Sequence, residues 1–519
     1  MMPKSLSLGS STFSKLIKGN RIYVDKTEYI YRLIHHSRDA YYFFSRPRRF
    51  GKSLLISTMK ELFSGNRELF KGLWIDQSDY DWQNHPVIHL DFADLDYQTA
   101  EQFRESLILK LIEIGRDHEI HIERSTLLNH ILSQLVKGLS QKNSVVFLVD
   151  EYDKPILDHL NNFKEADKIR TILNSFFSAA KSLESYWRCV FITGVSKFAK
   201  TSVFSGFNNL NDLSEDRVAS SLLGYTQNEL EHYFARYMAS LACKQSKSDD
   251  EIRELLKFWY NGYRFCADLS LERVYNPFSI NYVFGKEVFS NYWFDSGTPS
   301  FLIGLLRKQK EPIGKLDGSL MSDSGFRPFD LENLPLLPVF YQTGYLTIQD
   351  VYPEEKMVKL GYPNAEVRES MNPYLLGIFL HQDRIKSQSV VYEMKQALLA
   401  GDVERFVEFL QSLLANIPAK LHIPQERYYH SLLQLVCNLM GLEANSEIHT
   451  SQGIIDLVLE FPKQIYIMEL KFNRSAKEAL KQIQNKHYQD KYRVKGKPML
   501  CVGLSFKRQQ GGLVIDWFL

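Results

Sequence analysis

One stretch constrains the fold more than any other, because an aromatic run passes through a glycine-lysine-serine turn into an amphipathic pattern. AYYFF (40–44) is typical of a buried strand. Beyond Ser53 the apolar residues recur at helical spacing, and Gly65 fits the end of that helix. The turn FGKS (50–53) is therefore predicted to join a strand directly to a helix.

Strand, GKS turn and helix together form the context of a phosphate-binding loop. In this interpretation Gly51 lets main-chain N–H groups approach a phosphate, and Lys52 reaches its β- and γ-oxygens. Ser53 ligates Mg²⁺ at the helix N-terminus. The loop departs from the usual G-x-x-x-x-G-K-[ST], since Arg46 holds the first glycine position. A basic turn that binds no nucleotide is the alternative.

A second motif lies further along the chain, where SVVFLVDEYDKP (144–155) joins an apolar run to Asp150 and Glu151. A continuous apolar run predicts a strand buried on both faces. In nucleotide hydrolases with this layout, the first acid holds Mg²⁺ and the second polarises the attacking water. A strand that simply ends in solvated acids is the alternative.

Two more apolar runs, VIHLDF (87–92) and RCVFITGVSK (188–197), alternate with helical segments and predict strands of the same sheet. The second run ends in polar residues that include Thr193 and Ser196. We expect these two either to sense a γ-phosphate or to cap the next element.

The segment GIIDLVLEFPKQIYIMELKFNR (453–474) predicts two strands around a short turn. Because side chains alternate along a strand, Asp456, Glu469 and Lys471 interrupt otherwise apolar faces. Ionised groups on a buried face are costly unless they are paired or bound to metal. An Asp followed by Glu-x-Lys on paired strands suits a nuclease site, in which carboxylates hold Mg²⁺ and the lysine orients or deprotonates a water. A Glu-x-Lys on an exposed strand edge is the alternative.

Charge is distributed unevenly along the chain. The net charge is only +2, so any nucleic-acid binding must come from a local patch. Between Lys471 and Lys497, nine Lys and Arg oppose two acidic residues, which gives that strip a net charge of +7. Phosphate-backbone binding requires such a strip. A solvated helix face is the alternative.

Length and composition exclude several classes of protein. A chain of 519 residues predicts about two to four domains. The five cysteines form no C-x-x-C pair, which favours a reducing compartment over a disulfide or zinc scaffold. The N-terminus has no signal-peptide pattern, and no uncharged apolar run approaches the roughly 18 residues that span a bilayer. We expect a cytoplasmic protein with no membrane partner.

Several long strings carry a family resemblance: YVDKTEYI (23–30), SRPRRFGKSLL (45–55), FLVDEYDKPI (147–156), LLGYTQNEL (222–230) and WYNGYRF (259–265). In these strings the chain resembles the bacterial AAA-ATPase-like proteins that carry a C-terminal PD-(D/E)XK nuclease-like domain. The resemblance covers nearly the whole chain. In that family the loop is R-P-R-R-F-G-K-[ST], so Arg46 belongs to the motif.

The resemblance implies an α/β fold with two main parts. A P-loop (ASCE/AAA-like) parallel sheet with a helical lid is followed by a C-terminal α/β PD-(D/E)XK nuclease-like domain. We place the P-loop domain at 1–214, the lid at 215–330, the connector at 331–415 and the nuclease-like domain at 416–519.

The implied cofactors are ATP and Mg²⁺. The residues expected to contact the nucleotide are Arg48, Arg49, Phe50, Gly51, Lys52, Ser53 and Asp150. The expected metal ligands are Ser53 and Asp150 in the first domain and Asp456 and Glu469 in the second. The expected catalytic residues are Glu151, Asp456, Glu469 and Lys471.

The loop arginines have two interpretations. Their guanidinium groups contact a triphosphate, one of them as an arginine finger, or they pair with acids such as Asp25 and fix the loop. By this resemblance, the helices expected on either side of the C-terminal hairpin supply further candidates: Glu426, His430, Gln482 and Tyr488. Ordinary surface roles are the alternative, and we favour that alternative for His430 and Tyr488.

We therefore expect a protein that binds and hydrolyses ATP and couples this to a Mg²⁺-dependent nuclease-like domain acting on DNA. An oligomer is compatible with the sequence. One alternative is an ATP-dependent switch or sensor whose C-terminal domain binds nucleic acid or protein without cleavage. A second, a binding protein with two degenerate sites, is disfavoured because the acidic and lysine residues of both motifs are intact.

Overall fold

The computed structural model divides into two compact units. The first comprises Met1–Leu305 with Gly318–Glu366, and the second comprises Leu306–Asp317 with Val367–Leu519. The residues that the structure describes are 4–35, 40–123, 125–197, 203–207, 209–295, 302, 305–306, 316–326, 334–380, 384–415, 425–440, 444–450, 452–509 and 512–519. Within these residues no helix is both long enough and apolar enough to cross a membrane.

The N-terminal part of the first unit alternates strands and helices. Its strands are β1 (Ala40–Ser45), β2 (Val87–Asp91), β3 (Val145–Asp150), β4 (Trp187–Gly194) and β5 (Asn211–Asp212). Its α-helices are α1 (Phe13–Lys18), α2 (Thr27–His35), α3 (Lys52–Phe63), α4 (Ala100–Asp117), α5 (Leu128–Ser140), α6 (Lys154–Leu157) and α7 (Phe163–Ser182). Its 3-10 helices are η1 (Arg67–Phe70), η2 (Trp74–Gln77), η3 (Phe92–Asp94) and η4 (Glu184–Tyr186).

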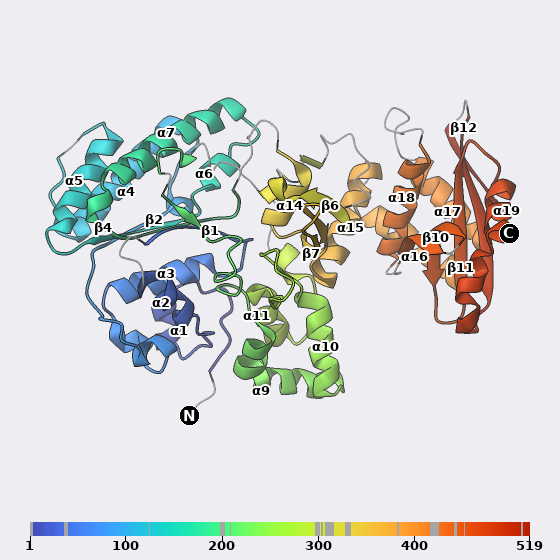
Figure 1. Ribbon diagram of the computed structural model, residues 1–519, viewed down its shortest axis with the longest axis horizontal. Coiled ribbons are helices and arrows are strands. Elements are labelled where there is room, and N and C mark those ends of the chain that lie inside the picture. Colours follow the sequence, from blue (N-terminus) through green and yellow to red (C-terminus); the bar gives the residue numbers. More distant parts are fainter. Residues whose placement is uncertain are drawn as a thin grey trace. The chain divides into compact units, whose positions relative to one another are not determined.

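The five strands form one parallel sheet in the order β2-β3-β4-β1-β5. Every residue of β1 and β3 is buried, as the continuous apolar runs predict. Helices α4, α5 and α7 cover one face and share its core, while α1, α2 and α3 lie on the other face (Figure 1). Strand β4 separates β1 from β3, so the tips of all three meet at the carboxyl edge of the sheet.

The rest of the first unit is a helical group and a small sheet. The elements are α9 (Gln227–Gln245), α10 (Asp249–Tyr260), α11 (Pro277–Lys286), α12 (Tyr292–Asp295), β6 (Ser319–Ser322), η6 (Asp323–Phe326), α14 (Leu336–Gln342), β7 (Thr347–Tyr352) and β8 (Met357–Gly361). Helix α9 begins with a capping box, in which the Thr226 side chain and the Glu229 side chain satisfy each other's main-chain N–H groups. The antiparallel order β6-β8-β7 places β6 inside the segment that we expected to be a helical lid.

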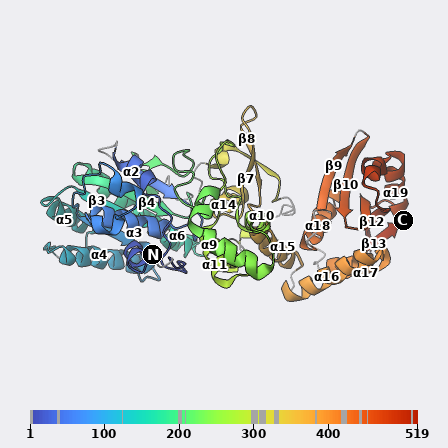
Figure 2. The same cartoon turned by 90° about the horizontal axis from the view of Figure 1, so that it is seen from below.

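The second unit is built around a mixed five-stranded sheet. Its elements are α15 (Ala365–Leu380), whose first two residues belong to the first unit, α16 (Arg384–Ala400), α17 (Val403–Ala415), α18 (Glu426–Leu439), β9 (Ala444–Thr450), β10 (Gly453–Glu460), β11 (Ile465–Phe472), α19 (Ala476–Asn485), η8 (Tyr488–Lys495), β12 (Met499–Gln509) and β13 (Gly512–Phe518). The sheet order is β13-β12-β11-β10-β9, and only β11 and β12 run parallel. Helices α16 and α17 lie side by side (Figure 2).

The predicted C-terminal hairpin is present. Strands β10 and β11 pair antiparallel, with Leu457 opposite Met468 and Glu460 opposite Ile465. Helix α19 packs closely on β12, because a Cβ at Gly503 would lie 2.1 Å from the main-chain oxygen of Ala476. The short turn and this packing fix the register that brings Asp456 and Glu469 together.

Candidate functional site

The loop between β1 and α3 has the geometry of an anion site. Gly51 precedes the first residue of α3 and has a φ of +99°, a conformation that a residue with a Cβ adopts only under strain. The N-cap residue of α3 is Gly51, which has no side chain to cap the helix, so the N–H groups of the first turn can bind a ligand.

Lys52 is buried in the first turn of α3. Its ammonium donates hydrogen bonds to the main-chain oxygens of Arg46 at 2.9 Å and Pro47 at 3.1 Å, so the side chain curls back over its own loop. Burial lowers the pKa of Lys52, and the nearby Asp150 and Glu151 oppose that shift. Hydrogen bonds to charged oxygens are stronger than those to neutral carbonyls. The Lys52 ammonium would therefore gain free energy by exchanging these carbonyls for charged oxygens.

Asp150 and Glu151 follow β3 and differ in environment. Asp150 is buried, and its carboxylate accepts hydrogen bonds from the Thr193 hydroxyl and, at 3.0 Å, from the N–H of Glu151. Glu151 has a φ of +51° and lines a cavity at this edge of the sheet. Burial raises the pKa of Glu151, which suits a carboxylate that takes up a proton.

Asp153 was missed by the sequence motifs, although it stands only three residues after Asp150. This buried carboxylate accepts hydrogen bonds from the N–H groups of Val195 and Ser196 and from the Ser196 hydroxyl, at 2.7–3.1 Å. The tips of β3 and β4 are therefore joined. In this arrangement both hydroxyls that we considered as phosphate sensors donate to acids, Thr193 to Asp150 and Ser196 to Asp153.

One cavity of about 550 Å³ brings most of the predicted residues together. Arg48, Arg49, Phe50, Gly51, Lys52, Ser53 and Glu151 all line it. The opposite walls come from the N-terminal segment and from α11, with Ser7, Tyr23, Phe278 and Asn281 among them. The volume and the mixture of apolar and polar walls suit a small molecule with an anionic end.

The loop arginines divide into two kinds. Arg46 is buried, and its guanidinium donates to the main-chain oxygens of Ser45, Ser214 and Ala219 at 2.7–3.0 Å. Arg48 and Arg49 are exposed and line the cavity, and the Arg49 guanidinium lies 5.0 Å from the Phe278 ring. Arg46 is not among the residues that line the cavity. It is anchored in the protein interior by carbonyl groups and so helps to fix the loop.

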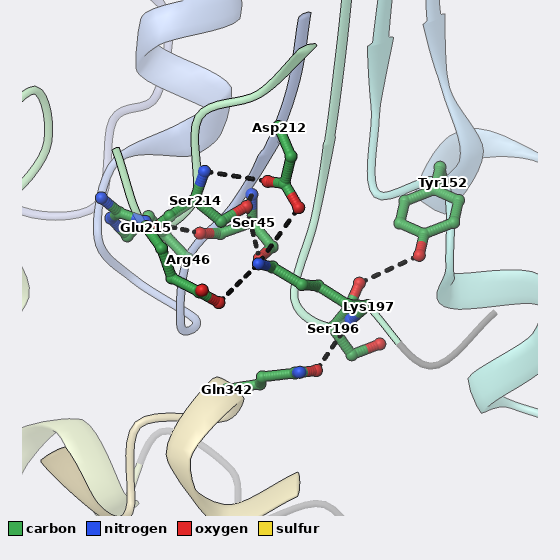
Figure 3. A network of polar contacts seen from close by, with 9 residues as sticks. All are labelled: Ser45, Arg46, Tyr152, Ser196, Lys197, Asp212, Ser214, Glu215 and Gln342. Carbon is green, nitrogen blue, oxygen red and sulfur yellow. Dashed lines mark hydrogen bonds and ion pairs between the residues drawn. The ribbon is translucent and has the colours of Figure 1, made fainter. Parts of the chain in front are cut away.

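A buried polar network continues from this anchor (Figure 3). The Lys197 ammonium lies 3.1 Å from the carboxylate of Asp212 and 2.6 Å from that of Glu215. Its main-chain N–H donates to the Gln342 side chain at 2.8 Å. The segment that follows β4 is thus fixed both to the loop after β5 and to α14.

The second constellation lies on β10 and β11. The Asp456 carboxylate accepts a hydrogen bond from the N–H of Leu470 at 2.8 Å, and the Lys471 ammonium lies 3.0 Å from Glu469. Burial raises the pKa of Asp456. The three predicted residues therefore lie together within the second unit.

Glu469 is the most desolvated member of this group. Its side chain is 1% exposed, and its Oε2 atom has no hydrogen-bond partner among the described residues. Burial, reinforced by the nearby Asp456 charge, raises the pKa of Glu469 to about 7. The carboxylates of Asp456 and Glu469 are oxygen donors of the kind that Mg²⁺ prefers, while the Leu470 carbonyl between Glu469 and Lys471 accepts a hydrogen bond from the Lys471 ammonium at 2.9 Å. Within the described residues, no three His, Cys, Asp or Glu side chains are arranged to hold a metal.

Neighbouring residues support the pair of strands. Glu426 accepts a hydrogen bond from the N–H of Phe472 at 3.1 Å, and its other oxygen lies 3.9 Å from Lys471. His430 Nε2 lies 2.7 Å from the main-chain oxygen of Asp456, which can only accept, so this nitrogen carries the proton. The Tyr488 hydroxyl donates to the Ile454 carbonyl at 2.8 Å. These contacts orient the strands.

The basic strip follows α19 and η8. Seven of its nine cations are exposed: Arg474, Lys477, Lys481, Lys486, Lys491, Arg493 and Lys495. Some are engaged locally, since Lys495 pairs with Glu460 at 2.6 Å and Arg493 with Asp490 at 3.1 Å. The strip nevertheless remains a concentration of exposed positive charge in the second unit.

These features define a class of protein: a P-loop-like α/β unit joined to a nuclease-like α/β unit. Residues 7–204 match the family model "Predicted AAA-ATPase", and residues 424–516 match the model "PD-(D/E)XK nuclease superfamily". The chain is also 35% identical over 532 residues to a protein of Azotobacter chroococcum mcd 1 described as "Uncharacterized protein in vnfD 5'region", covering 99% of this chain and 98% of that one. The chain belongs to the AAA-ATPase-like proteins that carry a C-terminal PD-(D/E)XK nuclease-superfamily domain. No solved structure matches it.

The raised pKa of Glu469 generates a prediction for stability. Because the folded protein holds this proton more tightly than the unfolded chain, the free energy of unfolding should fall as pH rises from about 4.5 toward about 7. Glu469→Gln removes the titration. Thermal unfolding is measured without divalent metal. Relative to the wild type, the free energy of unfolding of the variant should rise by on the order of 1–2 kcal/mol between pH 5 and pH 8. Parallel pH profiles for the two proteins would contradict the shift.

Proposed function

We propose that the first unit binds and hydrolyses ATP with Mg²⁺ and that the second unit is a Mg²⁺-dependent nuclease acting on DNA. One observation carries the first half: Lys52, Ser53 and Glu151 converge on a single cavity at the N-terminus of α3. The second half is supported by Glu469, which lies beside Asp456 and Lys471 and whose Oε2 atom has no hydrogen-bond partner among the described residues. Both halves agree with the family of the chain.

Each residue of the first site has a distinct task. The N–H groups at the start of α3 and the Lys52 ammonium bind the β- and γ-phosphates. Ser53 and Asp150 would hold Mg²⁺, which neutralises charge on the phosphates when bound. Glu151 orients the attacking water and accepts its proton, a role consistent with its raised pKa. Arg48 and Arg49 supply further cations at the mouth of the cavity.

The second site would act on a phosphodiester. Asp456 and Glu469 would hold Mg²⁺, which supplies Lewis-acid stabilisation of the phosphate charge when bound. Lys471 orients a water for attack, because its ammonium is fixed against Glu469 at 3.0 Å. The exposed cations of α19 and η8 bind the nucleic-acid backbone.

ATP binding or hydrolysis gates the nuclease or positions it on DNA. The alternative is a switch or sensor whose second unit binds nucleic acid or protein without cutting it. A cleavage assay with Mg²⁺ or Mn²⁺, on single- and double-stranded substrates with and without ATP, separates the two. Salt-sensitive DNA binding with no cleavage under any of these conditions would favour the sensor.

Two substitutions separate binding from turnover at the first site. Lys52→Ala should weaken ATP binding on the order of 10–100-fold, because it removes a charge-assisted contact to the phosphates. Glu151→Gln should leave binding intact and lower turnover on the order of 100-fold. Isothermal titration and a phosphate-release assay measure the two effects. Lys60→Ala, an exposed position later in α3, is the matched control. Equal loss of binding in both variants would refute the assigned roles.

Substitutions at the second site should abolish cleavage without affecting the first site. Asp456→Ala or Glu469→Ala should abolish divalent-dependent cleavage and leave ATP hydrolysis largely unchanged. Lys471→Ala should also abolish cleavage but spare metal binding, because an ammonium cannot be a ligand. Cleavage of labelled oligonucleotides and metal titration measure these outcomes, with the exposed Glu478→Gln as control. Full cleavage by the Asp456 variant would remove this site from the mechanism.

The basic strip should set the salt dependence of DNA binding. Replacing the exposed Lys481 and Lys486 with Ala should weaken binding and reduce the slope of log K against log salt by about 0.9 for each phosphate that the variant no longer neutralises. Fluorescence anisotropy over a series of salt concentrations measures the slope. Lys257→Ala, an exposed lysine of α10, is the control. An unchanged slope would leave the strip as a solvated helix face.

A further inference from the structure

The phosphate loop is held from behind by aromatic residues of the middle part of the first unit. The Arg46 guanidinium lies 4.2 Å from the Phe265 ring. The Phe50 ring lies edge-on to Tyr263 and Phe265, with centroids 4.8 and 5.3 Å away. The bulky residues that distinguish this loop therefore serve as packing anchors.

The main chain after α14 also comes very close to the loop. Gly344 has a φ of +87°, and a Cβ at this position would lie 2.7 Å from the Cβ of Pro47. Only a residue without a side chain permits this approach. Trp293 borders the same point, since the hypothetical Cβ would be 3.5 Å from its ring.

Trp293 bonds in two directions. Its indole N–H donates to the main-chain oxygen of Arg48 in the phosphate loop at 3.0 Å. Its main-chain N–H donates to the Glu366 carboxylate at 2.6 Å. The Trp293 side chain is buried, its bond to Glu366 is also buried, and its bond to the main chain of the exposed Arg48 is partly buried.

Glu366 receives contacts from two segments around the nucleotide cavity. It is 0% exposed, and it also accepts a hydrogen bond from the Ser279 hydroxyl of α11 at 2.8 Å. Phe278 and Asn281 of that helix line the cavity. Glu366 stands in the first turn of α15 and is the last residue of the first unit, so the chain enters the second unit immediately after it.

We propose that Trp293 is a positioning residue that ties the phosphate loop to the first turn of α15 through Glu366. It holds the Arg48 carbonyl and so preorganises the loop for a triphosphate. A change in the loop on nucleotide binding is transmitted to the point where the chain leaves the first unit. This coupling rests on the proposed ATP binding, whereas the positioning of the loop does not.

The test compares two tryptophan variants of the full-length protein. Trp293→Phe keeps an aromatic ring but removes the indole N–H. Trp187→Phe is the matched control, because Trp187 is also buried and its indole N–H donates to the Ala180 carbonyl at 2.8 Å. Trp187 begins β4, at the opposite end of that strand from the phosphate loop. Both variants lose an equivalent bond and a similar amount of thermal stability.

Hydrogen exchange of residues 46–53 without nucleotide is the first readout. Trp293→Phe should raise this exchange about fivefold, the factor expected for one net hydrogen bond, and Trp187→Phe should not. The Kd for Mg·ATP should rise about fivefold in Trp293→Phe with turnover at saturating ATP unchanged. In the wild type, Mg·ATP should alter exchange at 367–375, and this response should be lost in Trp293→Phe.

Equal loop exchange in all three proteins would overturn the positioning role. Weaker ATP binding without any change at 367–375 would overturn the coupling. A wild type that binds no ATP would refute the proposed function and the coupling, while the nucleotide-free exchange would still decide the role of Trp293. If Trp293→Phe does not fold, Glu366→Gln should raise loop exchange in the same direction, because a neutral amide accepts the Trp293 N–H more weakly than a carboxylate.

Discussion

A guanidinium ion removed from water needs new hydrogen-bond partners. Two nitrogens of Arg46 find them in main-chain carbonyls, whereas its buried Nε has no partner among the described residues. Its partners include the oxygens of Ser214 and Ala219, and its flat faces meet the rings of Phe44 and Phe265 at 4.3 and 4.2 Å. Removing these partners would leave a buried charge unpaired. Arg46 therefore fixes the end of β1 relative to the loop after β5 and to the segment that contains Phe265.

The buried carboxylates of the two units differ in how far hydrogen-bond donors satisfy them. Around Asp150 and Asp153, hydroxyl and main-chain N–H donors satisfy the acids, which stiffens the tips of β3 and β4. Glu469 has an oxygen with no such donor among the described residues. Desolvation without full compensation lowers stability but leaves an oxygen ready for a ligand. The buried acids of the first unit thus stiffen the tips of its strands, whereas Glu469 in the second unit keeps an oxygen that a ligand can use.

The local patterns were the predictable part. Continuous apolar runs located β1, β3 and β4, and the alternation of side chains located the hairpin of β10 and β11. The roles of Arg46 and Trp293 could not be predicted in this way. Arg46 bonds to Ala219 and Trp293 to Arg48, pairs separated by 173 and 245 residues. Periodicity carries no information about such contacts, and an arginine inside a phosphate loop resembles a phosphate ligand.

The burial of Arg46 also has a long-range electrostatic consequence. Burial lowers its pKa to about 10, so the guanidinium keeps its charge at neutral pH. Dissolved ions cannot enter the interior, so the field of this charge beneath the phosphate loop is screened only weakly, whereas exposed lysines lose most of theirs in salt. Under the proposed function, an increase in ionic strength should therefore release a nucleic acid from the second unit while a triphosphate stays bound in the first.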